Sequence, residues 1–201
     1  MLTTPEDIFK INAKHYSNLF SLVADNGIVD ARSFQIDCNN LSPIYRPKQE
    51  NGIDVRTAAP FKEMFEWLRL YDAFPCLYRW EILSPTILSP ELVNTIKSQL
   101  KEIKETTPTQ TPRVTKGAFP KDNTLYVGKS ESIVDRTIKH LGYHTHRDMH
   151  GLHLDDWTNL LNVKLILQLH VYVFPSECKP IMELFERSLA EIHPPLVGVH
   201  Y

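Results

Sequence analysis

Leu125-Tyr126-Val127-Gly128-Lys129-Ser130 decides the fold of this 201-residue chain, because it is typical of a strand that ends at a glycine and opens a helix. Apolar residues then follow at helical spacing: Val134, Ile138 and Leu141. Arg136 and His140 are four residues apart and off this stripe, so we expect both on one exposed face of the helix. The sequence predicts that Tyr126, Lys129, Arg136 and His140 converge at one corner, where they could hold and polarise a phosphodiester.

Two further segments alternate in a way that is typical of strands. Residues 76–83 place Tyr78, Trp80 and Ile82 on one face, and residues 163–174 alternate most regularly of all. We expect residues 163–174 to form the central core strand. Together with residues 123–129, the predicted sheet has three strands.

Helices are predicted between these strands and before them. Ser89-Pro90-Glu91 has the cap and proline of a helix start, and Ser132 with Asp135 forms a capping-box pattern whose helix stops at Gly142. The other expected helices begin near Pro5, near Ala59 and near Lys179, with a short one around residues 155–161. Residues 37–52 and 106–120 are rich in turn residues and are predicted to be loops.

Composition limits the function classes. The net charge of −2 is unusual for a protein that coats nucleic acid without specificity, although it leaves room for a local basic patch. No apolar run approaches the roughly 20 residues of a membrane span, and the first residues lack the pattern of a secretory signal. The three cysteines have no CxxC spacing, so we expect reduced thiols in a cytoplasmic protein.

The motifs together resemble the GIY-YIG nuclease domain over about residues 74–201. The first motif of that family corresponds to Cys76-Leu77-Tyr78, and the second corresponds to Tyr126-Val127-Gly128 with Lys129 directly after it. Arg136 lies ten residues after the second tyrosine, where the family has its catalytic arginine, and His140 follows. Glu186 best matches the metal-binding glutamate, and Glu183 is the second candidate for that position.

The chain departs from the family pattern at three places. Cys76 stands where the first motif has glycine, and Gly198 lies near the position of a terminal asparagine. Between Tyr78 and Tyr126 lie 47 residues, far more than the family usually has. We interpret residues 84–121 as an insertion that carries one helix.

The resemblance implies an α/β fold, with a small three-stranded, mainly antiparallel central sheet flanked by helices, and residues 1–73 as a mostly helical N-terminal extension. It also implies a divalent-metal-dependent endonuclease that cuts DNA, in restriction, repair or defence. Its expected catalytic residues are Tyr78, Tyr126, Lys129, Arg136, His140 and Glu186. Glu186 would hold Mg²⁺ or Mn²⁺, and Arg136 would hold the phosphate.

Several alternatives stay open at this point. Either Tyr78 or Tyr126 could position or deprotonate water, provided that a nearby cation such as Lys129 lowers the pKa of the phenol. The five histidines of residues 140–153 could form a polar surface loop, a loop over nucleic acid that uses His146 and Arg147, or a Zn²⁺ or Mn²⁺ site.

The chain as a whole also has competing interpretations. It could be a GIY-YIG-like module that has lost cleavage and only binds nucleic acid, or an interaction protein that docks through its N-terminal helices. The N-terminal residues 1–73 could be a recognition domain or helical cladding.

Overall fold

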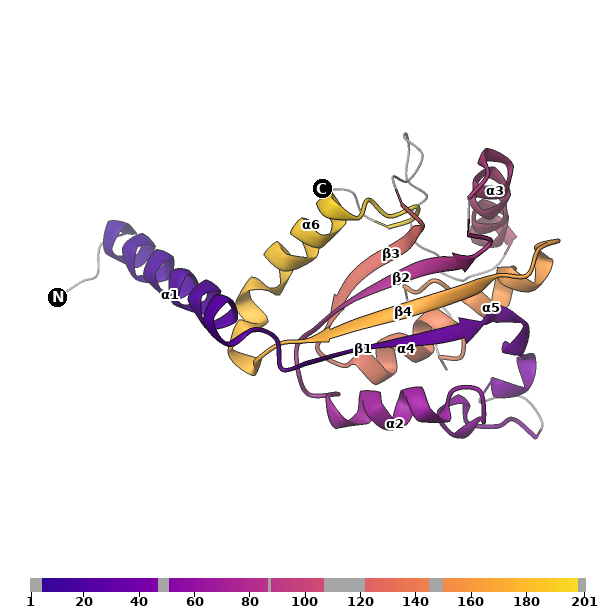
Figure 1. The fold of residues 1–201 in the computed structure, drawn as a ribbon, viewed down its shortest axis with the longest axis horizontal. Helices are drawn as coiled ribbons and strands as arrows, with labels where there is room; N and C mark the ends of the chain where they lie inside the picture. The colour runs from indigo at the N-terminus through magenta and orange to yellow at the C-terminus, as the bar shows by residue number, and fades with distance from the viewer. Residues whose placement is uncertain (1–4, 47–50, 87, 107–121, 145–149, 199–201) are drawn as a thin grey trace.

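The computed structural model describes residues 5–46, 51–86, 88–106, 122–144 and 150–198, and a four-stranded antiparallel sheet lies at its centre (Figure 1). The strands are β1 (Asp30–Asp37), β2 (Cys76–Ser84), β3 (Thr124–Ser130) and β4 (Ile166–Val173), in the order β1-β4-β2-β3. The helices are α1 (Pro5–Asn26), α2 (Lys62–Leu70), α3 (Pro90–Thr106), α4 (Ile133–Leu141), α5 (Leu154–Trp157) and α6 (Met182–Ile192). The α/β class is confirmed.

The prediction of three strands is wrong, because β1 adds a fourth. β1 pairs antiparallel with β4 and places Phe34 opposite Leu169. Only Phe34 and Ile36 alternate as apolar residues in β1, and both of its ends are aspartates. Edge strands often carry charged residues in this way, so their apolar pattern is weak. The N-terminal region predicted to be mostly helical therefore also supplies part of the sheet.

One face of the sheet carries the main core. Tyr78, Trp80 and Ile82 point to this face and are fully buried, as the alternation of β2 predicted. Helices α2 and α4 pack against each other and belong to the same core. The face is therefore closed by helices, and any polar group on it must find its partners inside the protein.

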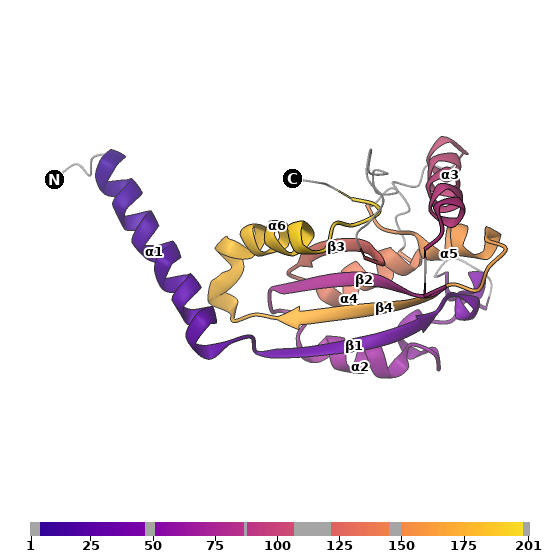
Figure 2. The same ribbon diagram turned by 45° about the horizontal axis from the view of Figure 1, so that its top comes forward.

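The opposite face is covered by α6 at one end (Figure 2). Leu77 alternates with Tyr78 and packs into a second, smaller apolar cluster together with Leu19 of α1 and Met182 of α6. Phe20 of α1 meets Phe185 of α6 edge-on, with 5.7 Å between the ring centroids. Most of α1 projects beyond these contacts, away from the sheet. No helix in the described ranges is long and apolar enough to span a bilayer.

The two tyrosine motifs lie on neighbouring strands despite their distance in the sequence. β2 and β3 are paired antiparallel, with Tyr78 opposite Gly128 and Trp80 opposite Tyr126. The segment between them contains α3, in agreement with the single helix predicted for the insertion, while residues 107–121 lie outside the described residues. The insertion is thus the connection of a hairpin, and it leaves the register of the two motifs intact.

The start of α4 is fixed by an aspartate from another segment. Ser132 is the N-cap residue, but its side chain makes no capping bond, so the predicted Ser132–Asp135 capping box is wrong. Asp72 replaces it: its Oδ1 accepts hydrogen bonds from the backbone N–H of Val134 (2.8 Å) and from Ser132 Oγ (3.2 Å). Gly142 ends the helix with φ of 99°, as predicted.

Candidate active site

Arg136 on α4 joins the two tyrosines of the motifs. Its Nε donates to Tyr78 Oη at 2.8 Å, and its Nη2 donates to Tyr126 Oη at 3.1 Å. Its Nη1 donates to the backbone carbonyl of His150 at 2.8 Å. Tyr78 and Tyr126 stack with 6.2 Å between ring centroids. The structure therefore brings together the two phenols and the guanidinium that the motif spacing predicted to meet.

Gly128 is required by the close approach of these rings. A Cβ at position 128 would lie 2.6 Å from Tyr78 Cζ and 2.8 Å from Tyr126 Cε1. Real carbon atoms do not approach this closely, so any other residue would push the phenols apart. The glycine of the Tyr126-Val127-Gly128 motif is thus a steric condition for the site as well as the end of a strand.

His140 is buried, so the prediction of an exposed position is wrong. Its ring is surrounded by those of Tyr78, Trp80 and Tyr126, whose centroids lie 5.3, 5.7 and 5.0 Å away. Helical periodicity describes only the apolar stripe of the helix itself. The segment after Gly151 covers a second side of α4, and a Cβ at Gly151 would lie only 2.6 Å from the Lys139 carbonyl oxygen.

The hydrogen bonds of His140 define its neutral tautomer. Its Nδ1 accepts from the backbone N–H of Leu152 at 3.1 Å, so the ring hydrogen is on Nε2 and points to Tyr78 Oη at 3.0 Å. Burial, reinforced by the charge of Arg136, lowers the pKa of His140 well below its usual value. His140 is therefore a neutral donor that orients Tyr78, and it is poorly suited to be a general acid.

The two phenols differ in exposure and in chemistry. Tyr78 is fully buried, and burial raises its pKa well above its usual value, although Arg136 opposes the shift. The condition that a neighbouring cation lowers the pKa of the water-activating phenol is therefore not met at Tyr78, because the effect of desolvation exceeds that of Arg136. Tyr126 is only partly buried. Of the two, Tyr126 is the phenol that a substrate or water can reach.

The positive charge of Arg136 has no carboxylate bonded to it in the described residues. The guanidinium donates to two phenols and to a carbonyl group. Burial disfavours the charged guanidinium, but its interactions with Tyr78 and Tyr126 outweigh that effect and raise its pKa. Within the described ranges, three of its five N–H groups donate hydrogen bonds, which leaves one on each terminal nitrogen. The site is thus a half-buried cation with a free donor pair.

Glu186 and Lys129 lie at the side of this cluster, near α6. The pKa of Glu186 is raised by burial, while Lys129 and Arg136 act to lower it, so both cations are close to the carboxylate. Within the described part of the chain, Glu186 has neither a hydrogen bond nor an ion pair. Glu183, the second candidate, is exposed and paired with Arg187 at 2.6 Å and with Lys129 at 3.9 Å. The arrangement favours Glu186 as the residue that faces the site.

The histidine-rich segment is spread over different environments. His144 lies 3.1 Å from Asp135 on α4, His153 is buried, and His150 is exposed. His146 and Arg147 lie outside the described residues. No group of three or more histidine, cysteine or acidic residues that could hold a metal ion occurs in the described ranges. Here the segment contributes its backbone, through the His150 carbonyl and the Leu152 N–H.

These backbone contacts and the cap from Asp72 were not predicted from the sequence. A carbonyl or N–H group carries no sequence signal of its own. The available hint was Gly151, because a residue without a Cβ allows another backbone segment to approach closely. Asp72 lies 60 residues before Ser132 in the sequence, so a local capping pattern does not include it.

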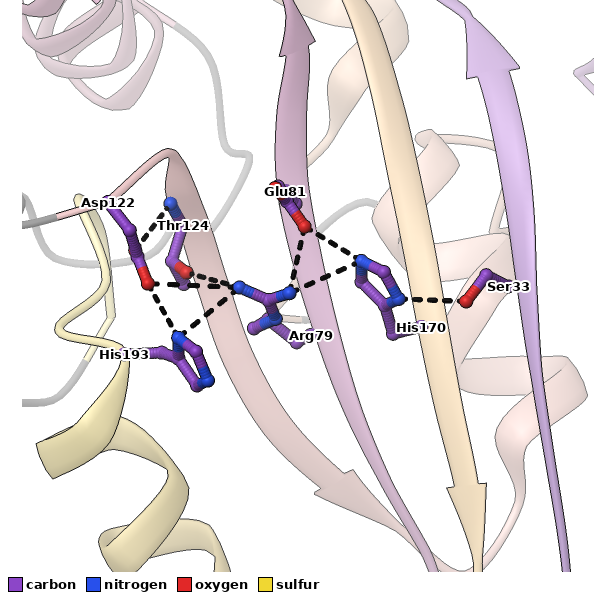
Figure 3. Close-up of polar contacts among 7 residues, drawn as sticks. All are labelled: Ser33, Arg79, Glu81, Asp122, Thr124, His170 and His193. Carbon is purple, nitrogen blue, oxygen red and sulfur yellow. Dashed lines mark hydrogen bonds and ion pairs between the residues drawn. The ribbon is translucent and has the colours of Figure 1, made fainter.

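A second polar network crosses the other face of the sheet (Figure 3). It is formed by Ser33, Arg79, Glu81, Asp122, Thr124, His170 and His193. Arg79 Nη2 donates to Glu81 Oε2 at 2.8 Å, its Nη1 donates to Thr124 Oγ1 at 3.1 Å, and the same nitrogen lies 3.8 Å from Asp122. The charge of Arg79 is therefore matched by two carboxylates.

Each histidine of this network also has an acidic partner. His193 Nδ1 is 2.5 Å from Asp122 Oδ2, and His170 Nε2 is 2.9 Å from Glu81 Oε2. His170 Nδ1 is hydrogen-bonded to Ser33 Oγ at 2.8 Å, so the network extends from the end of α6 to β1. It links the strands to one another, although Arg79 Nε is buried without a hydrogen-bond partner in the described residues.

Comparisons of the chain with models of known protein families, with curated proteins and with solved structures found no match. The support for a function therefore comes from the contacts of the site described above.

Proposed function

We propose that the chain is a divalent-metal-dependent endonuclease that hydrolyses phosphodiester bonds of DNA, with the cluster around Arg136 as its active site. The observation that carries this proposal is the guanidinium of Arg136, which has no carboxylate hydrogen-bonded to it within the described residues and keeps one unused N–H there on each terminal nitrogen. Such a pair of donors matches two oxygens of a phosphate. The resemblance of Tyr78, Tyr126, Arg136 and Glu186 to the GIY-YIG nuclease motifs supports the same function.

The residues of the cluster have separate roles in this proposal. Phosphodiester hydrolysis needs an attacking water in line with the leaving oxygen, and positive charge at the phosphoryl oxygens. Arg136 supplies the charge and holds the phosphate. Tyr126, whose oxygen accepts from Arg136, presents its own hydroxyl hydrogen to a phosphoryl oxygen or to the water. Tyr78 and His140 are positioning residues, because both are buried and hydrogen-bonded to each other, and Tyr78 in turn accepts a hydrogen bond from Arg136.

Glu186 fits the requirements of a magnesium ligand. Mg²⁺ is usually held by one or two carboxylates, with waters and substrate phosphates completing its coordination. A half-buried carboxylate whose pKa is raised by burial, and which has no direct partner in the described residues, is such a ligand. When bound, the ion supplies Lewis-acid stabilisation of charge on the phosphoryl and leaving oxygens.

Cleavage of plasmid DNA in the presence of Mg²⁺ or Mn²⁺ tests the proposal. The wild-type protein should nick or linearise the plasmid, and Arg136→Ala and Glu186→Gln should each abolish this activity. Glu183→Gln is the matched control on the same helix, and it should retain cleavage because Glu183 is exposed and paired with Arg187.

Two outcomes would contradict the proposal in different ways. Cleavage that survives both Arg136→Ala and Glu186→Gln would show that the active site lies elsewhere. If the wild-type protein binds DNA in a gel-shift experiment but does not cleave it in the presence of any divalent ion, the chain is a binding module instead.

A further inference from the structure

A small cavity lies beside the proposed active site, between the end of β3 and the start of α6. It has a volume of about 200 Å³ and is lined by Lys129, Ser130, Glu131, Lys179 and Met182. Two of its five lining residues are lysines, whose ammonium groups bind phosphate as compact point charges. The cavity thus has the size of a small polar group and two cations at its wall.

Within the described part of the chain, both lysines are held by exposed ion pairs. Lys179 Nζ lies 3.0 Å from Glu131 Oε2, with side-chain exposures of 44% and 64%. Lys129 Nζ lies 3.9 Å from Glu183 Oε2, with exposures of 40% and 51%. Exposed pairs of this kind contribute little to stability, so an incoming anion can replace either carboxylate at small cost.

Ser130 adds a neutral donor to the same wall. Its Oγ accepts a hydrogen bond from the backbone N–H of Ser132 at 3.0 Å, which leaves the hydroxyl hydrogen to donate. An anion in the cavity could therefore meet two ammonium groups and one hydroxyl.

Lys129 connects this cavity to the proposed active site. The same side chain lines the cavity and lies close enough to Glu186 to lower its pKa. Lys129 also directly follows Gly128, which pairs with Tyr78 of the cluster, so a strand with one phosphate at Arg136 could reach Lys129 and Lys179 with a neighbouring phosphate. Free inorganic phosphate has the same charge chemistry, and it is the other possible source of the anion.

We propose that this cavity binds the phosphate group of a nucleotide next to the scissile phosphodiester, with Lys179 as the principal new contact. The inference rests on the proposed nuclease function and extends it by a second phosphate site. In this arrangement Arg136 selects the bond to be cut, and the two lysines fix the direction of the strand. Glu131 competes with the phosphate for Lys179 and so weakens binding.

Fluorescence anisotropy with a short labelled DNA duplex in EDTA tests this site without cleavage. Each phosphate contact contributes about 0.9 to the slope of the logarithm of affinity against the logarithm of salt concentration. Lys179→Ala should therefore make the slope shallower by about 1. Glu131→Gln should tighten binding at low salt by up to about fivefold, because the competing exposed ion pair is removed.

Lys164→Ala is the matched control. Lys164 also pairs with a single carboxylate, Asp37, at 2.8 Å, but it lies next to β4 at the opposite end of the sheet from Lys129. This variant should keep the wild-type slope. If Lys179→Ala and Lys164→Ala have the same slope as the wild-type protein, the cavity does not bind DNA.

Inorganic phosphate provides the second arm of the experiment. A rise of the melting temperature with phosphate that is lost in Lys179→Ala, together with an unchanged DNA slope, would assign the cavity to the free anion and overturn the proposal. A wild-type protein with no affinity for DNA at any salt concentration would instead overturn the nuclease function itself.

Discussion

Arg79 and Arg136 occupy opposite faces of one sheet region, and their surroundings differ in one decisive way. Arg79 is matched by Glu81 at 2.8 Å and by Asp122 at 3.8 Å, whereas Arg136 donates to phenols and a carbonyl within the described part of the chain. The network of Arg79 brings two carboxylates to its cation and links the strands. Arg136 has no carboxylate bonded to it in the described residues, and Glu186 acts on it only through space, so the proposed function assigns a phosphate to its unused donors. An arginine with a histidine nearby does not by itself indicate a site, because the acidic partners decide whether any charge is left for a ligand.

The largest effect is expected from changing Arg136 to lysine. Arg136→Lys keeps the charge but loses the planar fork that joins Tyr78, Tyr126 and the phosphate. The rate of DNA cleavage should fall by about 10²- to 10³-fold, the usual effect of removing a donor to a transition-state oxygen. Plasmid cleavage under single-turnover conditions measures it.

Arg79→Lys is the control for this comparison. It keeps a cation between Glu81 and Asp122 and should leave the cleavage rate unchanged. An equal loss of activity in the two variants would show that the faces are not functionally distinct.

The second effect concerns the glycine beneath the phenols. Gly128→Ala would place a methyl group against the rings of Tyr78 and Tyr126, so we expect the free energy of unfolding to fall by about 1–3 kcal/mol. Cleavage should fall as well, because the phenols that hold Arg136 are displaced. Urea denaturation and plasmid cleavage give the two quantities.

Gly27→Ala separates backbone strain from damage to the site. Gly27 has φ of +72°, and no atom lies within 4 Å of the place that a methyl group would take, so the change should cost stability alone. Full activity in Gly128→Ala would contradict the steric explanation.

The third effect is a pH dependence of stability that belongs to His140. Burial and Arg136 lower the pKa of His140 in the folded state, so the unfolded chain binds a proton that the folded chain does not. As the pH falls below about 6.5, stability should fall by up to about 1.4 kcal/mol per pH unit from this group. Urea denaturation between neutral and mildly acidic pH measures the slope.

His140→Gln should remove this contribution, while His15→Gln on the exposed surface of α1 should leave it unchanged. The same slope in His140→Gln and the wild-type protein would show that the pH dependence comes from another group.

The smallest effect, on the free energy of unfolding, is expected when Arg79 loses its acidic partners and so comes to resemble Arg136. The double variant Glu81→Gln and Asp122→Asn removes the acidic partners of Arg79 and leaves its charge unmatched. The free energy of unfolding should fall by about 1 kcal/mol at low salt, and phosphate should restore part of it. Melting curves with and without phosphate test this.

Further substitution of Arg79→Gln in that double variant is the control, and it should abolish the response to phosphate. If the response persists in the triple variant, the anion acts at another place.

Much of the fold could be predicted from the sequence, because β2 and β4 alternate clearly and because Gly27, Ser89 and Gly142 mark helix ends. The exception is β1, where two apolar residues between charged ends give too little pattern. The convergence of Tyr126 and Arg136 could also be predicted from their spacing on a strand and the helix that follows, whereas the place of Tyr78 beside them was implied by the resemblance to the GIY-YIG motifs.

The burial of His140 could not be predicted, because it depends on a segment that arrives from later in the chain. The same holds for the direction of the pKa shift of Tyr78, which is set by the amount of water excluded around it. Sequence patterns report which residues share a face of an element. They do not report what another element places over that face.

The hairpin between β2 and β3 has a consequence for how such a chain can vary in length. Tyr78 and Gly128 face each other near one end of the hairpin, and the long connection leaves from the other end. Closing a longer loop costs entropy only logarithmically, about 0.6 kcal/mol for each doubling of its length. Residues can therefore be added to or removed from this connection at little thermodynamic cost, while the pairing that aligns the two tyrosines is preserved.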